Sequence, residues 1–276
     1  MRACIELPRD YGWGPVRILR GRIEDDGYQV TEIRSPSHIR LAVTGGSRAG
    51  RETEPEGVMA GVPQQAPHDV LPVLPALAPL LPGKGLAKAS VVAVDRAGTL
   101  CVALIAGPSQ AGMWCGVAGM PDLGIVAAAE AGAEPGRMML VPEPGPQWAE
   151  VAAAMLDACA VVLLRPPGRP PAQARRRLET AARRSGAALI VAGEWDGAPV
   201  GLHVTRQQWD GIGDGYGRLR ARRAEVTAEG RGALVRPRRA WLWLPGPDGK
   251  ITAAATPADS RARGAGEGNW HRTGSG

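Results

Sequence analysis

The sequence contains no phenylalanine and only three lysines in 276 residues. Thirty of its 33 basic residues are therefore arginine, and eight tryptophans supply most of its aromatic side chains. This bias, together with abundant Ala, Gly and Pro, is typical of a GC-rich coding genome. The arginine content alone therefore says little about a binding surface.

The four cysteines are scattered and form no C-x-x-C pair, so the usual signature of a zinc or dithiol redox site is missing. Cys101, Cys115 and Cys159 lie in apolar runs, where cysteine packs as a small hydrophobic residue. We see no signal peptide, and every apolar run is too short or too interrupted to span a bilayer. We expect a cytoplasmic protein without a membrane partner.

The composition nevertheless supports a folded domain, because 44% of the residues are hydrophobic. The formal net charge of +6 permits contact with nucleic acid or an acidic protein without demonstrating either. Three regions are distinguishable. Residues 1–68 are poorly patterned, with strands expected near 16–23 and 29–33 and disorder in much of the rest. Residues 69–250 are well patterned, and 251–276 have the composition of a flexible tail.

Strands and helices alternate through the central region. Apolar segments at 90–94, 113–119, 138–141, 160–164 and 187–192 predict strands, and the segments between them predict helices at 100–107, 123–132, 147–159 and 171–184. Strands that are apolar throughout indicate a mainly parallel α/β sheet flanked by helices on both faces. After Gly193, alternating segments at 200–209, 216–227 and 239–244 predict an antiparallel C-terminal extension.

This order of elements resembles the RecA core, over residues 70–250. The chain resembles more closely the ImuA-prime family, RecA-like accessory proteins of the bacterial mutasome. The matching segments are M-P-D-L-G (120–124), V-P-E-P-G-P-Q-W-A-E-V (141–151), V-V-L-L-R-P-P-G-R (161–169), R-R-L-E-T-A-A-R-R-S-G-A-A-L-I-V-A-G (176–193) and W-L-W-L-P-G-P-D-G (241–249).

The sequence departs from an ATPase at three positions. A phosphate-binding loop needs G-x-x-x-x-G-K-[ST] after the first strand, but here the strand leads into Asp95 and a short connection without lysine. Met120 stands where RecA proteins carry the glutamate that activates water, with Asp122 two residues away. Arg165 follows the strand that ends in an acidic Mg²⁺-associated residue in ATPases. We therefore expect no nucleotide cofactor and no enzymatic activity.

The resemblance implies a non-catalytic protein-binding accessory factor for error-prone translesion DNA synthesis in the SOS response to DNA damage. Its implied partners are an ImuB-like Y-family polymerase homologue and, indirectly, an error-prone replicative-type polymerase, with association with the nucleoid on damage. Two alternatives stay open. One is an inhibitor of cell division of the SulA type, and the other is a DNA-binding relic of a recombinase.

Two groups of side chains are candidates for binding. Tryptophan and arginine are enriched at interface hot spots, and edge strands can pair with a partner. The predicted protein interface comprises Arg218, Arg220, Arg238, Arg239, Trp241 and Trp243. Trp195 and Trp209 are further candidate anchors. Weak DNA binding is a second hypothesis, with contacts from the arginine-rich helix at Arg175, Arg176, Arg183 and Arg184, although these residues could equally form a solvated helix face.

Overall fold

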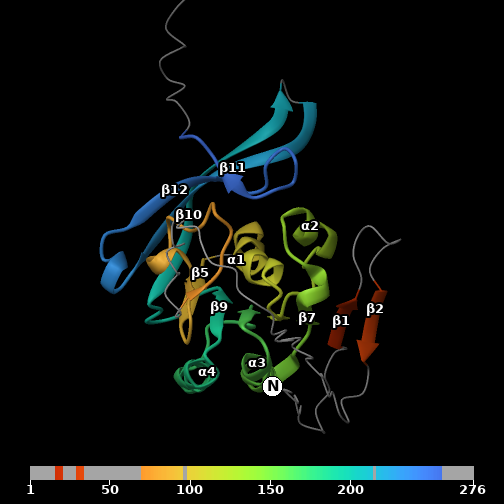
Figure 1. The fold of residues 1–276 in the computed structure, drawn as a ribbon, viewed down its shortest axis with the longest axis vertical. Coiled ribbons are helices and arrows are strands. Elements are labelled where there is room, and N and C mark those ends of the chain that lie inside the picture. Colours follow the sequence, from red (N-terminus) through yellow and green to blue (C-terminus); the bar gives the residue numbers. More distant parts are fainter. Residues whose placement is uncertain (1–15, 21–28, 34–69, 96–97, 214–215, 257–276) are drawn as a thin grey trace, which may run out of the picture.

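The structure is a computed structural model that describes residues 16–20, 29–33, 70–95, 98–213 and 216–256. Most strands belong to one sheet, with the order β13-β12-β11-β10-β5-β9-β8-β6-β7-β1-β2. Helices lie on both faces of its central part, and the C-terminal strands rise from one edge (Figure 1).

The centre of the sheet is parallel, as the sequence predicts. Its strands pair in the order β10-β5-β9-β8-β6-β7, and every pairing in this series is parallel. The short, apolar strands occupy nearly the predicted positions: β5 (Val91–Val94), β6 (Cys115–Ala118), β7 (Met138–Val141), β8 (Val161–Leu164) and β9 (Ala188–Ala192).

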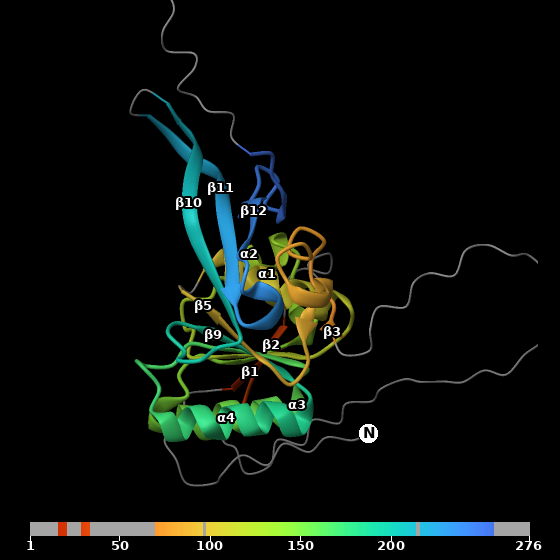
Figure 2. The same ribbon diagram turned by 90° about the vertical axis from the view of Figure 1, so that its left-hand side faces the viewer.

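Each face of the parallel strands packs against its own pair of helices. Alternation along β8 illustrates this: Val161 and Leu163 join one hydrophobic core, whereas Val162 and Leu164 join the other. The helices α1 (Thr99–Gln110) and α2 (Ile125–Glu130) cover the first face. The helices α3 (Trp148–Ala158) and α4 (Ala172–Ser185) lie together beneath the second face (Figure 2).

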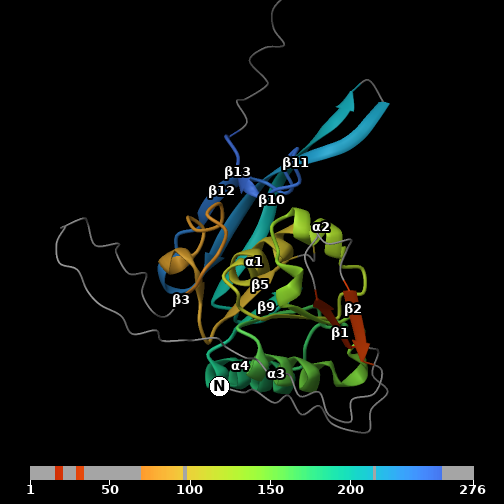
Figure 3. The same cartoon turned by 45° about the vertical axis from the view of Figure 1, so that its right-hand side comes forward.

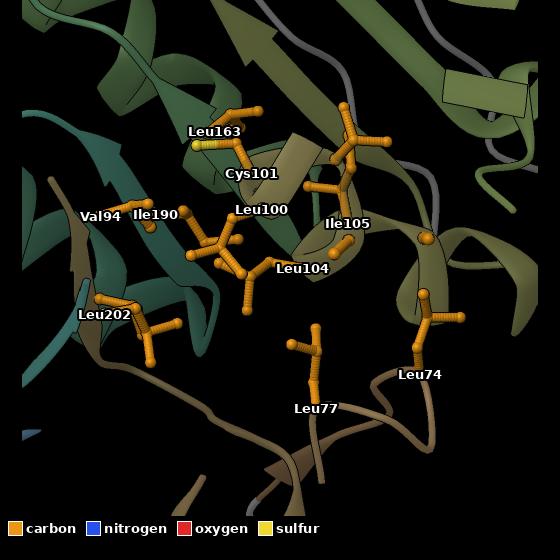
Figure 4. Close-up of a cluster of buried hydrophobic side chains, with 14 of the residues drawn as sticks. Leu74, Leu77, Val94, Leu100, Cys101, Leu104, Ile105, Leu163, Ile190 and Leu202 are labelled. Carbon is orange, nitrogen blue, oxygen red and sulfur yellow. The ribbon is translucent and has the colours of Figure 1, made fainter. Parts of the chain in front are cut away.

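The helix α1 is buried on all sides, because the segment 70–87 covers the side that faces away from the sheet. Leu100, Leu104 and Ile105 of α1 point into the core between the sheet and Leu77 of that segment (Figure 4). Gly107 is a point of close approach, since a Cβ atom there would lie 2.5 Å from the Cα atom of Val73. A helix that is apolar all round is typical of such a buried position.

The predicted antiparallel extension is present and forms the C-terminal edge. Its long hairpin is β10 (Val200–Gly213) and β11 (Tyr216–Gly230), followed by β12 (Arg238–Trp243) and β13 (Thr252–Ala253). The β13 strand pairs with β12, and Ile251 is buried, so the region predicted to be a tail contributes to the fold through residue 253. Residues 257–276 of that predicted tail lie outside the described residues.

The N-terminal region adds two strands at the opposite edge. The strands β1 (Val16–Arg20) and β2 (Gln29–Ile33) lie within the segments predicted as strands, and β1 pairs antiparallel with β7. Other residues predicted to be disordered there lie outside the described residues.

The small elements are a separate ribbon of β3 (Val70–Leu71) and β4 (Leu86–Ala87), and the 3₁₀ turns η1 (Pro82–Lys84), η2 (Pro135–Arg137), η3 (Gly145–Gln147) and η4 (Gly232–Leu234).

The described cysteines are buried, as predicted for packing residues. Cys101, Cys115 and Cys159 lie in the hydrophobic interior. Burial raises the pKa of Cys101 and of Cys115 to about 12, because the charged thiolate loses its hydration there. None of the helices in the described part of the chain has the length and apolar character needed to cross a bilayer.

Candidate functional site

The carboxyl ends of β5, β6 and β8 meet at one edge of the sheet, which is where open α/β sheets commonly bind ligands. The β5 strand ends at Val94 and α1 begins at Thr99, so only residues 95–98 connect them. The first helical N–H groups could receive an anion. However, the connection has neither the length nor the lysine of a phosphate-binding loop.

An ion pair joins two positions at this edge that the sequence analysis considered separately. The Arg165 guanidinium donates to both carboxylate oxygens of Asp122, at 2.6 and 3.1 Å. Its Nε also donates to the carbonyl oxygen of Gly119 at 2.8 Å. Arg165 directly follows β8, and Gly119 and Asp122 follow β6, so one side chain connects the ends of neighbouring strands.

This ion pair has an electrostatic consequence. Hydrogen bonding to Arg165 holds the pKa of the Asp122 carboxyl below its ordinary value of 3.8. Asp122 is thus an anion already neutralised by a bidentate partner, which makes it a poor choice for a Mg²⁺ shell or a general base. Among the described residues, no group of His, Cys, Asp or Glu has the arrangement needed to hold a metal ion.

A small cavity of about 290 Å³ lies beside the ion pair. Thr99 and Val102 of α1 line it, together with Met120 and residues of α2. Pro245 and Gly249 close another side from the turn after β12. Met120 is the residue predicted to stand in place of the catalytic glutamate. It is 6% exposed and belongs to the hydrophobic core. The cavity therefore combines an apolar wall with an internally paired charge.

A larger cavity of about 870 Å³ lies beyond β5, between the turn 193–198 and residues 229–237. Asp95, Glu194, Asp196 and Glu229 give it an acidic lining. Part of that charge is already paired: Asp196 accepts from Arg169 at 2.7 Å and from Arg175 at 2.8 Å, and His203 lies 3.2 Å from Glu229. The two arginines thus neutralise part of the acidic lining without a ligand.

The sheet extension has an outer face that carries Arg239, Trp241 and Trp243. The two tryptophans alternate onto this same face, as predicted. They are half-buried and belong to neither hydrophobic core. Arg223 of β11 stacks on the Trp243 ring at 5.3 Å. The α3 and α4 helices lie beneath the parallel strands and do not extend to β12 (Figure 2).

The six residues of the predicted protein interface do not form one surface. Arg238 is next to Arg239 on β12, so the two side chains point to opposite faces. Arg238 donates to the Leu81 carbonyl at 2.9 Å and thereby connects β12 to the segment over α1. Arg218 and Arg220 lie on the projecting part of β11, beside the register shift between Asp210 and Ile212 and beyond the residues that pair with β12. Only Arg239, Trp241 and Trp243 remain together, and their binding role stays a prediction.

The arginines of the predicted DNA-binding helix differ in whether a carboxylate pairs with them. Arg175 pairs with Asp196, and Arg184 pairs with Asp157 of α3 at 2.7 Å. Arg176 and Arg183 are exposed, and no carboxylate in the described residues pairs with either. Arg177 also pairs with Glu150 of α3. Because these ion pairs connect α4 to α3, the helix presents less free positive charge than its sequence indicates.

The two further candidate anchors, Trp195 and Trp209, differ in their exposure to solvent. Trp195 is 6% exposed and lies in the hydrophobic core that α4 covers. Its ring N–H donates to Glu179 at 3.2 Å. Trp195 is therefore not a surface anchor. Trp209 is 45% exposed on β10, with Arg222 at 5.3 Å from its ring centre. Polar neighbours in the sequence therefore did not distinguish a core tryptophan from a surface one.

Together the fold and this edge define an α/β domain with a mainly parallel sheet between helices, whose sequence has no phosphate-binding loop. A family model described as the MT3502 N-terminal domain matches residues 79–197. The chain is 32% identical over 151 residues to the uncharacterized protein Rv3395c of Mycobacterium tuberculosis (strain ATCC 25618 / H37Rv), covering 51% of this chain and 74% of that protein. It therefore belongs to the same family as Rv3395c.

Two solved structures also align with this chain. The RadB recombinase aligns with a TM-score of 0.47 at 12% identity, over 65% of this chain and 97% of that chain. The KaiC-like protein PH0186 from Pyrococcus horikoshii OT3 aligns with a TM-score of 0.45 at 13% identity, over 68% of this chain and 99% of that chain.

Proposed function

We propose that this chain is a non-catalytic accessory factor that binds an ImuB-like polymerase homologue and supports error-prone translesion DNA synthesis after damage. Through that partner it acts indirectly with an error-prone replicative-type polymerase. The main supporting observation is the Arg165–Asp122 pair at the edge where an ATPase would bind Mg²⁺ and phosphate. When a domain's own side chains occupy the edge at which a ligand would bind, we expect the domain to act by binding other proteins and not by catalysis.

The outer face of β12 is the proposed docking surface. Trp241 and Trp243 provide adjacent flat side chains that stay partly exposed, and exposed Arg239 lies on the same face. Tryptophan and arginine dominate binding energy where water can be excluded around them. An apolar segment of the partner with acidic residues at its border would match this composition.

Capture by a tagged ImuB-like partner tests the proposal. We expect the Trp241→Ala, Trp243→Ala double variant to weaken capture by about tenfold or more, as hot-spot truncations of about 2 kcal/mol do. Trp209→Ala is the matched control, since it removes an exposed tryptophan from the opposite face of the same sheet extension. Variants that keep their circular dichroism spectrum and still bind the partner fully would reject this docking surface.

A further inference from the structure

The hairpin of β10 and β11 extends well beyond the body of the protein. Its pairing with β12 ends at Arg223, and Arg222 makes two more backbone hydrogen bonds, to Leu244 and Pro245. Beyond Arg222 the two strands pair only with each other. Figures 2 and 3 show the distal hairpin rising away from the helices and the parallel sheet. Residues 209–213 of β10, which lie beyond this pairing, span roughly 15 Å, at about 3.3 Å per residue. Such an arm contributes little to the core and leaves both faces accessible.

The projecting segment is rich in positive charge. Residues 206–223 contain five arginines and two aspartates. Arg206 pairs with Glu225, and Arg223 lies 3.7 Å from Asp210. Arg218 and Arg220 are both exposed, and neither has a carboxylate partner in the described part of the chain. The unneutralised charge is therefore concentrated toward the tip.

The arm combines this charge with an aromatic ring. Trp209 and Arg222 are cross-strand partners, and the guanidinium lies over the ring. The Arg222 Nε donates to the Leu244 carbonyl at 2.8 Å, so the arginine is fixed at the base of the arm and in turn positions the tryptophan. Arg220 and Arg218 follow along β11 toward the tip, where the pairing of the two strands shifts register opposite Gly211. Asp210 points to the other face, where it approaches Arg223.

We propose that the distal part of the hairpin binds single-stranded nucleic acid through Trp209, Arg218, Arg220 and Arg222. A base stacks on Trp209, and the phosphates on either side contact Arg218 and Arg220. Stacking on an aromatic ring combined with a basic track is the general way in which single strands are bound without sequence preference. The arm is distinct from α4, whose arginines are partly neutralised by Asp157 and Asp196.

Two alternatives are less well matched to this part of the hairpin. A duplex keeps its bases stacked internally and would leave the Trp209 ring without a partner. An acidic peptide would neutralise Arg218 and Arg220 but offers no flat group of comparable size for the ring. The inference does not depend on the accessory role, because the proposed partner surface carries Trp241 and Trp243 on the opposite face.

Fluorescence anisotropy with a labelled 20-nucleotide oligo(dT) tests the inference on the full-length chain. We expect the Trp209→Ala, Arg218→Ala, Arg220→Ala variant to bind about tenfold or more weakly, since stacking alone contributes about 1–3 kcal/mol per base. Loss of two phosphate contacts should reduce the slope of log K against log salt by about 1.4. The Arg176→Ala, Arg183→Ala variant of α4 is the control, because it removes two exposed arginines elsewhere and should bind as the wild type does.

Four results would overturn the inference: no binding of oligo(dT) by the wild type, equal losses in the hairpin and α4 variants, duplex bound as tightly as the single strand, or displacement of the strand by poly-glutamate at an equal concentration of charge. Partner capture separates this result from the proposed function. The hairpin variant should still be captured by the ImuB-like partner, and the Trp241→Ala, Trp243→Ala variant should still bind oligo(dT).

Discussion

At the scale of single residues, a few side chains hold together the edge of the sheet at which β6 and β8 end. Arg165 makes three hydrogen bonds to groups that follow β6, two to Asp122 and one to the Gly119 carbonyl. Gly119 has φ +75°, and a Cβ atom there would lie 2.2 Å from the Arg165 carbonyl oxygen. This position therefore requires glycine, because any side chain would separate the two strand ends.

The ion pair predicts a specific dependence of stability on pH. The pKa of Asp122 is lower in the folded chain than its ordinary 3.8, so the carboxylate stabilises the fold above that value. The stabilisation is lost as pH falls through the folded pKa. Asp122→Asn should thus unfold at lower urea than wild type at pH 7, with the difference shrinking below pH 4. Glu143→Gln, an exposed control, should show no such trend. A difference independent of pH would contradict the electrostatic account.

Gly107 tests the packing of α1 against the segment that covers it. A Cβ atom at this position would meet Val73 and Leu74 backbone atoms at 2.5–2.8 Å, so backbone must move to accommodate it. We expect Gly107→Ala to destabilise the fold by about 1–3 kcal/mol, despite the better helix propensity of alanine. Gly168→Ala, where a Cβ atom meets nothing within 4 Å, should change stability by less than about 0.5 kcal/mol in the same urea titration. Equal effects of the two substitutions would refute this packing.

At the scale of elements, the sequence located the strands and helices well because each has a distinct apolar pattern. The β8 prediction, 160–164, differs by one residue from Val161–Leu164. Pairing across long separations was harder to predict. No local pattern shows that the Arg238 guanidinium reaches the Leu81 carbonyl, or that α4 arginines pair with Glu150 and Asp157 of α3. The predicted binding surfaces therefore included too many arginines. The sequence does not show that a carboxylate far along the chain already pairs with some of them.

The distal hairpin is an element that we expect the fold not to need. We expect that replacing residues 211–220 with Asn-Gly, which joins the paired residues Asp210 and Ala221 by a two-residue turn, leaves the thermal midpoint of unfolding within a few degrees of wild type. The shortened chain also loses Arg218 and Arg220, so its affinity for oligo(dT) should fall. A cooperative transition that disappears on shortening would show that the arm is part of the core.

At the scale of the whole molecule, the predicted architecture is confirmed. The parallel sheet between helices and the antiparallel extension follow from the alternation of short apolar strands, helices and later polar-apolar strands. The absence of a phosphate-binding loop was also readable from the sequence. What replaces the loop was not: the opposite charges of Asp122 and Arg165 become meaningful only when β6 and β8 are known to be neighbours. Strand adjacency is set by the global topology, which single residues do not encode.

The most direct test of the account is calorimetric titration of the full-length chain with ATP and Mg²⁺. A closed edge without a lysine-bearing loop, with Asp122 already paired to Arg165, predicts no saturable heat up to about 1 mM nucleotide, which corresponds to binding no stronger than about −4 kcal/mol. The same preparation should bind oligo(dT), which establishes that the protein is folded and active in binding. Saturable ATP binding with micromolar affinity would contradict the account, because the edge would then open to a ligand.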